Sequence, residues 1–188
     1  MRVDRQDVLD RAQEVFAERG YRATSLSHVA SQIGVTRQAL YYHFPRKVDV
    51  LLALFSRVMD YFELAADAIG EEGEEALLFD RLLESHARIV ARNIDLVTIL
   101  LSENAELPAD IRPDVQARRR AYTNRLIGAY RDGVRAGRLT PSNPKFTVYT
   151  LLGALNCMYR WYQPTGPMDP DEMATTSVDL LARGYRAH

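Results

Sequence analysis

The sequence predicts an all-α protein with about nine helices, three short ones followed by six longer ones. Apolar residues recur at helical spacing through most of the 188 residues, whereas the alternation typical of a strand is almost absent. Clusters of Gly, Pro, Asp and Asn separate the apolar stripes and mark the ends of helices. The pattern changes at residue 47, so we expect an N-terminal domain of residues 1–47 and a larger domain of residues 48–188.

Charge and cysteine content exclude several classes of protein. The formal net charge is −1, and residues 1–49 contain 8 Lys and Arg against 6 Asp and Glu, so only the N-terminal part leans positive. Cys157 is the single cysteine, which excludes an internal disulfide and fits a reducing cytoplasm. The N-terminus lacks the apolar segment of a signal peptide, and the apolar runs are too short to cross a bilayer. We therefore expect a cytoplasmic protein without a membrane partner.

The N-terminal domain is predicted to contain three helices, each with a capping residue before it and Gly or Pro after it. They are residues 5–19 between Asp4 and Gly20, a helix that begins at Leu26 between Ser25 and Gly34, and a short helix between Thr36 and Pro45. The second and third helices, with a turn at Gly34, have the pattern of a helix-turn-helix.

In a helix-turn-helix, the N-terminal part of the second helix enters the major groove of DNA. Arg37 and Gln38 occupy that part here. Arg can read the O6 and N7 atoms of guanine, and Gln can read the N6 and N7 atoms of adenine, each through two hydrogen bonds. Tyr41, His43 and Lys47 are spaced to reach phosphate oxygens, which position a protein but do not specify sequence.

A purely structural interpretation of the third helix is that its aromatic side chains pack on neighbouring helices. Tyr42 and Phe44 are the candidates for such packing. This interpretation gives no reason for polar side chains such as Arg37 and Gln38 at the start of a short capped helix, so we favour DNA contact for them.

Residues 24–51, TSLSHVASQIGVTRQALYYHFPRKVDVL, resemble the signature of the tetracycline-repressor (TetR) family. The resemblance implies a homodimeric transcriptional regulator, usually a repressor, that a small ligand releases from a palindromic operator. Two positions depart from the family pattern: His28 stands where an acidic residue is common, and Arg46 replaces a frequent Ser and offers a further phosphate contact. The positions that would face DNA are Ser25, Thr36, Arg37, Gln38, Tyr41, His43 and Lys47.

The larger domain is predicted to bind the ligand and to form the dimer. Its expected helices are residues 47–69, 75–92, 94–105, 113–136, 145–163 and 171–185. Polar residues interrupt three of the apolar stripes, at His86, Arg119 and Asn156. A buried polar group needs a hydrogen-bond partner, which can be a ligand or another residue of the core or dimer interface. For each residue alone, the core or interface role is the simpler interpretation; we expect at least one to face a ligand.

The segment LLGALNCMYRWYQPTGP, residues 151–167, resembles the corresponding helix of TetR-family regulators that respond to acyl-CoA thioesters. A hydrophobic effector, such as an acyl-CoA, is therefore expected; adaptable Met59 and apolar Phe62 suit a flexible chain. Residues 117–120, ARRR, could meet CoA phosphates, but a solvated charged face is the simpler interpretation. The expected ligand-binding residues are Met59, Phe62, His86, Arg119, Tyr122, Asn156 and Tyr159.

Three alternatives compete with an acyl-responsive repressor. One is a repressor of a drug-efflux gene that responds to an aromatic or cationic compound. Another is a small helical enzyme, but the sequence has no P-loop, dinucleotide fingerprint, nucleophile elbow or metal-ligand spacing, so we expect no catalytic residue, cofactor or metal. The last is an interaction module that does not bind DNA, which leaves Arg37, Gln38 and Lys47 unexplained.

Overall fold

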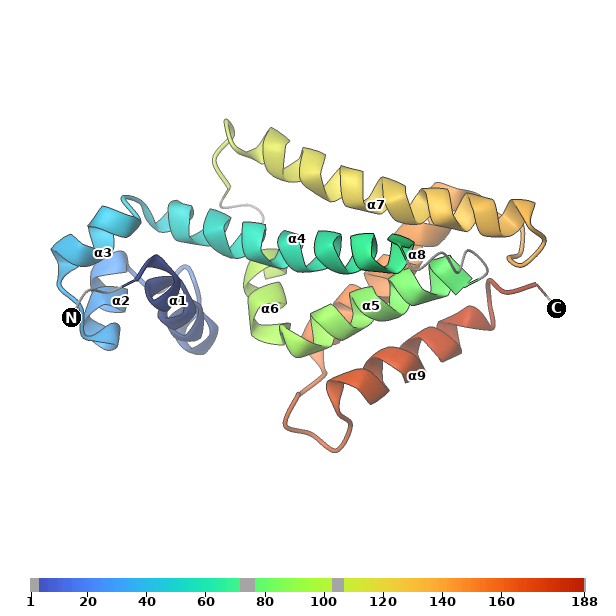
Figure 1. Ribbon diagram of the computed structural model, residues 1–188. Helices are drawn as coiled ribbons and strands as arrows, with labels where there is room; N and C mark the ends of the chain where they lie inside the picture. The colour runs from blue at the N-terminus through green and yellow to red at the C-terminus, as the bar shows by residue number, and fades with distance from the viewer. Residues whose placement is uncertain (1–3, 72–76, 103–106, 188) are drawn as a thin grey trace. The chain divides into compact units, whose positions relative to one another are not determined.

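The structure, a computed structural model, describes residues 4–71, 77–102 and 107–187. These residues form nine α-helices and one 3₁₀ helix (Figure 1), and their only β-type pairing is an isolated bridge between Leu139 and Arg186. The prediction of an all-α fold is therefore confirmed. Contacts divide the chain into two compact units, Met1–Val58 with Asp95–Ile111, and Met59–Ile94 with Arg112–His188. The boundary expected after residue 47 falls inside the first unit.

Unit 1 contains the three short helices, the start of a long helix and a later helix. They are α1 (Arg5–Arg19), α2 (Leu26–Ile33), α3 (Arg37–His43), the first part of α4 (Lys47–Glu71) and α6 (Ile94–Ser102). Val8, Phe16, Val29, Leu40 and Leu54 are buried and belong to its apolar core. The contacts place α6 in the same unit as the N-terminal helices, whereas the sequence pattern predicted that it belongs to the larger domain.

The helix boundaries in unit 1 follow from local capping. The Ser25 hydroxyl accepts a hydrogen bond from the His28 backbone N–H, and the Thr36 hydroxyl accepts one from the Ala39 N–H, both at 3.1 Å. Gly34 has φ 71° and ψ 26°, a left-handed conformation that costs other residues energy. Asp4 precedes α1 as expected, but its side chain makes no capping hydrogen bond. Local signals therefore fix the helix-turn-helix.

Helix α1 is also tied to the first part of α4. The Arg57 guanidinium lies 2.6 Å from the Asp10 carboxylate and donates a 2.8 Å hydrogen bond to the Gln6 side chain. Because the Arg57 side chain is only 18% exposed, water screens this ion pair less than a fully exposed one.

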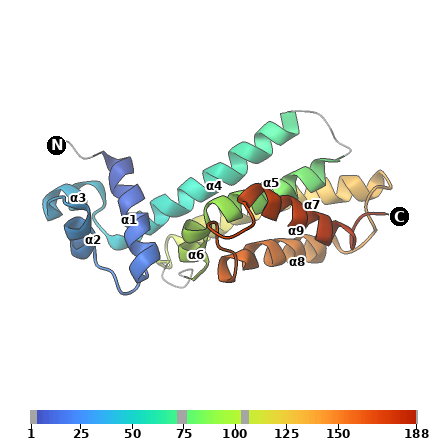
Figure 2. The same cartoon turned by 90° about the horizontal axis from the view of Figure 1, so that it is seen from below.

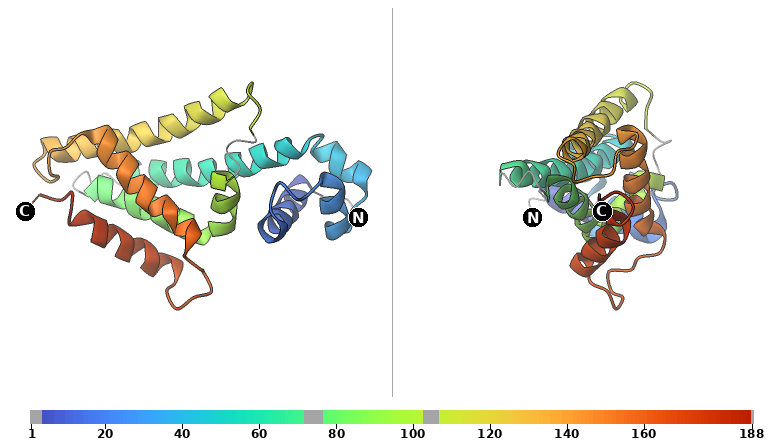
Figure 3. Two further views of the ribbon diagram at one scale, coloured as in Figure 1. Left: turned by 180° about the vertical axis from the view of Figure 1, so that it is seen from behind. Right: turned by 90° about the vertical axis from the view of Figure 1, so that its right-hand side faces the viewer.

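Unit 2 contains the rest of α4 and the long C-terminal helices. These are α5 (Leu78–Arg92), α7 (Arg112–Arg135), α8 (Pro144–Asn156), the 3₁₀ helix η3 (Cys157–Arg160) and α9 (Pro170–Ala182). Helix α5 lies alongside α9 and contacts α7 and α8 (Figure 2). Seen from behind, α8 crosses in front of α5 (Figure 3). Helix α5 is thus the element around which unit 2 packs.

Several helix ends differ from the sequence expectation. The helix expected over residues 145–163 stops at Asn156, where the chain tightens into η3, a common way for the last turn to satisfy its carbonyls. Helix α9 stops at Ala182, because the following residues pair with the segment before α8: Thr140 N–H donates to Tyr185 O at 2.7 Å. The expected helix start at 75 and end at 105 lie outside the described residues.

Candidate functional site

The start of α3 presents polar side chains to solvent. Thr36, Arg37 and Gln38 are exposed, and Tyr41 is 43% exposed. Leu40 of the same helix is fully buried and anchors it. The side chains predicted to read bases are therefore available to a DNA groove.

Tyr42 shows where the packing interpretation was wrong. Its side chain is 83% exposed, and its ring meets the His43 ring edge-on with a centroid distance of 5.3 Å. Phe44, the other candidate, is fully buried, with the Arg5 guanidinium 4.6 Å from its ring centroid. Sequence reasoning missed Tyr42 because an aromatic residue within a helix is usually part of the core. Its exposure adds it to the candidate DNA-contacting residues.

Lys47 and Arg46 already contact other parts of unit 1. The Lys47 ammonium lies 4.0 Å from the centroid of the Tyr21 ring and 3.5 Å from the Arg22 carbonyl oxygen. The Arg46 guanidinium pairs with Asp49 at 2.7 Å, which raises the pKa of Arg46 and lowers the pKa of Asp49. Their phosphate contacts, like the other DNA contacts, stay predictions.

In unit 2, the structure brings together four of the predicted ligand-binding residues. The His86 ring of α5 lies with its Nδ1 atom 3.1 Å from the Tyr122 hydroxyl of α7 and its Nε2 atom 3.1 Å from Oδ1 of Asn156 in α8. The Phe62 ring of α4 stacks on His86, with a centroid distance of 4.5 Å and an interplanar angle of 13°. We call Phe62, His86, Tyr122 and Asn156 the His86 cluster.

Burial fixes the protonation state of this cluster. His86 is 4% exposed, and burial lowers its pKa to about 4, so the imidazole is neutral at pH 7. Burial likewise raises the pKa of Tyr122, which keeps its O–H. Because Asn156 Oδ1 can only accept, His86 Nε2–H donates to it, and Nδ1 accepts from the Tyr122 O–H.

The remaining predicted ligand-binding residues lie in different surroundings. Met59 is 4% exposed on α4, one turn before Phe62. Arg119 is half-buried on α7, and burial lowers its pKa. The Tyr159 hydroxyl accepts a 3.0 Å hydrogen bond from Arg160 Nε, so its partner is a neighbour in η3 rather than the His86 cluster.

The charged segment 117–120 is not a simple solvated face. The Arg118 side chain is 29% exposed and forms ion pairs with Asp60 and Glu63 of α4. The sequence interpretation missed these pairs because the partners are 55 and 58 residues away.

The described residues show neither a cluster of metal ligands nor a helix able to span a membrane. Among residues 4–71, 77–102 and 107–187, no three His, Cys, Asp or Glu side chains are placed to hold a metal ion together. The helices in the same ranges include none with the length and apolar character needed to cross a membrane.

Comparison with known proteins identifies the family. Residues 8–54 match the family described as bacterial regulatory proteins, tetR family, and residues 73–185 match the tetracyclin repressor-like C-terminal domain. The fatty acid metabolism regulator protein of Bacillus subtilis is 27% identical over 180 residues, which cover 94% of this chain and 93% of that protein.

Solved structures agree with this assignment. A TetR/AcrR-family transcriptional regulator from Thermobifida fusca is 36% identical with a TM-score of 0.75, and the match covers 97% of this chain and 98% of that one. The regulator AibR, solved in complex with isovaleryl coenzyme A and operator DNA, is 25% identical with a TM-score of 0.83, over 94% and 96% of the two chains. The matched families and relatives are transcriptional regulators rather than enzymes. The chain therefore belongs to the TetR family of bacterial transcriptional regulators, whose members bind DNA through a helix-turn-helix of the kind formed here by α2 and α3.

Proposed function

We propose that this regulator represses transcription by binding a palindromic operator as a homodimer, and that a hydrophobic acyl effector, most simply an acyl-CoA, releases it. The exposed polar start of α3, capped by Thr36 and anchored by buried Leu40, supports DNA reading by Arg37 and Gln38. As a regulator of chromosomal genes, it would act in the cytoplasm.

Dimer formation is supported by large apolar side chains left exposed on unit 2. Phe146 and Tyr149 of α8 are 70% and 49% exposed, and Leu180 of α9 is 68% exposed. Apolar surface of this kind on two helices suits a four-helix interface with the same helices of a second copy. One recognition helix reads only a few base pairs, so a dimer with half-sites roughly 34–36 Å apart gains the selectivity that a monomer lacks.

The effector site is proposed at the His86 cluster, and the single observation that carries this proposal is its mixed chemistry. Phe62 and Met59 supply an apolar wall, whereas His86, Tyr122 and Asn156 supply hydrogen-bonding groups without net charge. Ligand sites typically combine an apolar lining with a few convergent polar groups. The Tyr122 O–H, which now donates to His86, could donate instead to the carbonyl oxygen of a thioester.

An acyl effector is favoured over a cationic drug by the charge of the buried residues. The buried polar or charged residues in the described part of the chain are Thr24, His86 and Thr123, and none is a carboxylate. A buried cation without a paired carboxylate would be strongly disfavoured. Two relatives, a fatty acid metabolism regulator and a regulator solved with isovaleryl coenzyme A, support the same class of effector. A neutral aromatic compound is the second candidate, because it could stack on the Phe62 ring once that ring has moved away from His86.

The proposed switch runs through α4. This helix is continuous from Lys47 to Glu71, so its first part belongs to unit 1, with α3, and its last part carries Met59 and Phe62 into unit 2. A ligand that requires a different position of Phe62 also favours a different position of α4. By linkage, the ligand then weakens operator binding by the same factor by which the operator weakens ligand binding, typically 5–150-fold.

The test is fluorescence anisotropy of labelled promoter DNA from the regulator's own locus, titrated with isovaleryl-CoA and palmitoyl-CoA. Free CoA is the matched control for the nucleotide part, and tetraphenylphosphonium is the cationic aromatic comparison. We expect the acyl-CoAs to lower operator affinity at least 5-fold and free CoA to leave it unchanged. Release by tetraphenylphosphonium alone would overturn the acyl assignment and leave the DNA-binding part intact.

A further inference from the structure

We propose that a set of ion pairs between α4 and α7 latches α4 against the effector site and sets the effector concentration needed for release. The α4–α7 latch consists of three carboxylates on α4 and two guanidinium groups on α7: Asp60, Glu63, Asp67, Arg118 and Arg125. This inference rests on the proposed function, because it concerns regulation of the same site.

Arg118 forms the first half of the latch. Its Nε donates to Glu63 Oε1 at 2.8 Å and its Nη2 to Glu63 Oε2 at 2.7 Å, a bidentate geometry that is stronger and more directional than a single contact. The Nη2 group also pairs with Asp60. Two carboxylates therefore hold one guanidinium.

Arg125 forms the second half. Its guanidinium pairs with the Asp67 carboxylate and also donates to the Ala66 carbonyl oxygen. A methyl group at Gly70 would lie 3.1 Å from Arg125 Nη2, so the absence of a side chain there leaves room for the guanidinium. The Arg125 guanidinium thus contacts both a side chain of α4, Asp67, and the backbone of α4, at Ala66.

The two halves have the same spacing on both helices. Asp60 and Asp67 are seven residues apart on α4, as are Arg118 and Arg125 on α7. Seven residues span about two helical turns, or roughly 10.5 Å, so the pairs join the helices in one register along that length. In Figure 1, α4 and α7 run in the same direction, as this register requires.

The latch opposes the movement that a ligand needs. Phe62 lies between Asp60 and Glu63 in the sequence, and its ring stacks on His86 at a centroid distance of 4.5 Å, which leaves no room between the rings. A ligand that enters beside His86 must move the Phe62 side chain or all of α4. Moving α4 away from α5 and α7 lengthens every pair of the latch. The latch therefore favours the ligand-free position of α4, which the proposed function equates with operator binding.

Exposed ion pairs add little to global stability, but they can shift a balanced equilibrium between two helix positions. The side chains of the latch are between 29% and 62% exposed, so salt should weaken it.

The structural arm of the test measures the distance between α4 and α7 directly. Spin labels go on Leu64→Cys and Arg120→Cys, both exposed, in a Cys157→Ser background that removes the native thiol. We expect one narrow distance for the parent protein and a longer or broader distribution after Arg118→Gln with Arg125→Gln.

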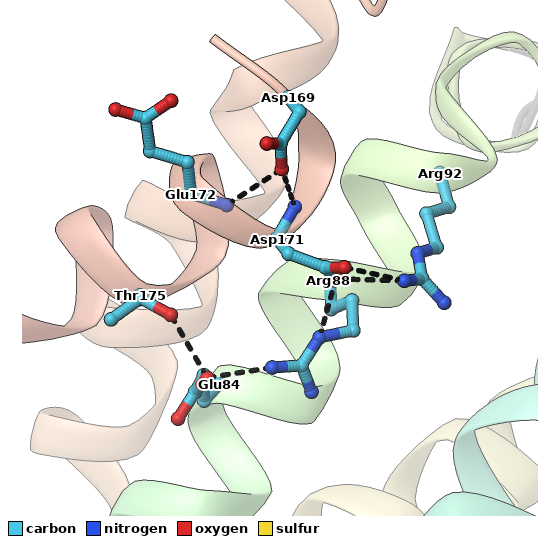
Figure 4. Close-up of polar contacts among 7 residues, drawn as sticks. All are labelled: Glu84, Arg88, Arg92, Asp169, Asp171, Glu172 and Thr175. Atoms are coloured by element: carbon cyan, nitrogen blue, oxygen red, sulfur yellow. Dashed lines mark hydrogen bonds and ion pairs between the residues drawn. The ribbon is translucent and has the colours of Figure 1, made fainter.

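The control variant is Arg88→Gln. Arg88 of α5 pairs with Asp171 of α9 at 2.8 Å and with Glu84 at 2.6 Å (Figure 4), and its side chain is 34% exposed, close to the 29% and 37% of Arg118 and Arg125. The Arg88→Gln variant removes ion pairs of similar exposure that do not involve α4. The distance between α4 and α7 should therefore stay as in the parent protein.

The functional arm measures the isovaleryl-CoA concentration that gives half-release from the operator. Each lost pair should lower that concentration about 2- to 5-fold, and the difference from the parent should shrink at high salt. A charge swap, Arg118→Glu with Glu63→Arg, should restore the parent value where Arg118→Glu alone does not.

Unchanged distance and unchanged half-release in the double Gln variant would overturn the latch. If no acyl-CoA releases the parent protein, the effector assignment fails, and the distance arm still decides whether the latch positions α4.

Discussion

His86 Nδ1 lies 3.1 Å from the hydroxyl of Tyr122, although the two residues are 36 positions apart. Since the other ring nitrogen contacts Asn156, one imidazole joins α5, α7 and α8, and both of its nitrogens are used. A ligand that enters here must replace at least one of these hydrogen bonds or bind to an acceptor that they leave free, such as the lone pairs of the Tyr122 oxygen. The cluster is therefore both a structural element of unit 2 and its candidate recognition site.

Stability should depend on pH through His86. Its pKa in the folded protein is about 4, below the ordinary value of 6.5, so folding favours the neutral imidazole. Above pH 6.5, His86 is neutral in both the folded and the unfolded protein, and its contribution to the free energy of unfolding is at its maximum. As the pH falls from 6.5 to 4, that contribution decreases by roughly 3 kcal/mol. Urea unfolding at several pH values should show this decrease in the parent protein and a smaller one in His86→Gln. Equal slopes for both proteins in that interval would contradict a buried neutral His86.

Removing the Tyr122 hydroxyl should destabilise the protein. Tyr122→Phe keeps the ring that packs on Phe62 but leaves the buried His86 Nδ1 without its donor. We expect the free energy of unfolding to fall by about 1–3 kcal/mol. Tyr61→Phe, at an exposed position on α4, is the matched control and should change it by less than about 0.5 kcal/mol. Thermal or urea unfolding measures both.

Gln38 and Lys47 should affect DNA binding differently. If Gln38 reads a base, Gln38→Ala should cost about 1–3 kcal/mol of operator binding and relax the preference at one position. Lys47→Ala should weaken binding to all sequences alike and flatten its salt dependence. Selection from randomised operators, with affinities at several salt concentrations, separates the two effects. An unchanged base preference in Gln38→Ala would reverse the assignment.

Charge placed on the exposed apolar face of α8 or α9 should dissociate the dimer. Phe146→Glu and Leu180→Glu are expected to shift the parent dimer toward monomer in analytical ultracentrifugation at micromolar concentration, because a carboxylate would be buried unpaired in the interface. Leu64→Glu on α4 alters a side chain of nearly the same exposure, 67%, and should leave the dimer intact. A monomeric parent protein would rule out the proposed interface.

A larger side chain at Met59 should uncouple the effector from the operator. Met59 is buried one turn before Phe62, so Met59→Trp adds volume beside the proposed effector site. We expect operator affinity to stay within a few-fold of the parent and acyl-CoA release to be lost; overpacking could cost about 1–3 kcal/mol of stability. Anisotropy titrations with and without palmitoyl-CoA measure the response, and a calorimetric scan checks folding. A normal response in a folded variant would place the effector elsewhere.

Much of unit 1 could be predicted from the sequence because its signals are local. The capping hydroxyls of Ser25 and Thr36 act on a backbone N–H three residues away, and Gly34 supplies its left-handed conformation without help from other residues. Signals of this range fix where helices begin and end and which side of each is apolar.

The sequence by itself therefore determined the all-α class, the helix-turn-helix and the family, whereas only the tertiary structure decided which side chains meet. Periodicity placed Tyr42 on a helix but could not show that no neighbouring helix covers it. His86 and Asn156, 70 residues apart, could each be identified as polar residues in apolar stripes, but their contact depends on how α5 and α8 cross. The same holds for Arg118, whose carboxylate partners lie on α4. A cap acts within one turn of the chain, whereas these contacts depend on the packing of helices that are distant in sequence.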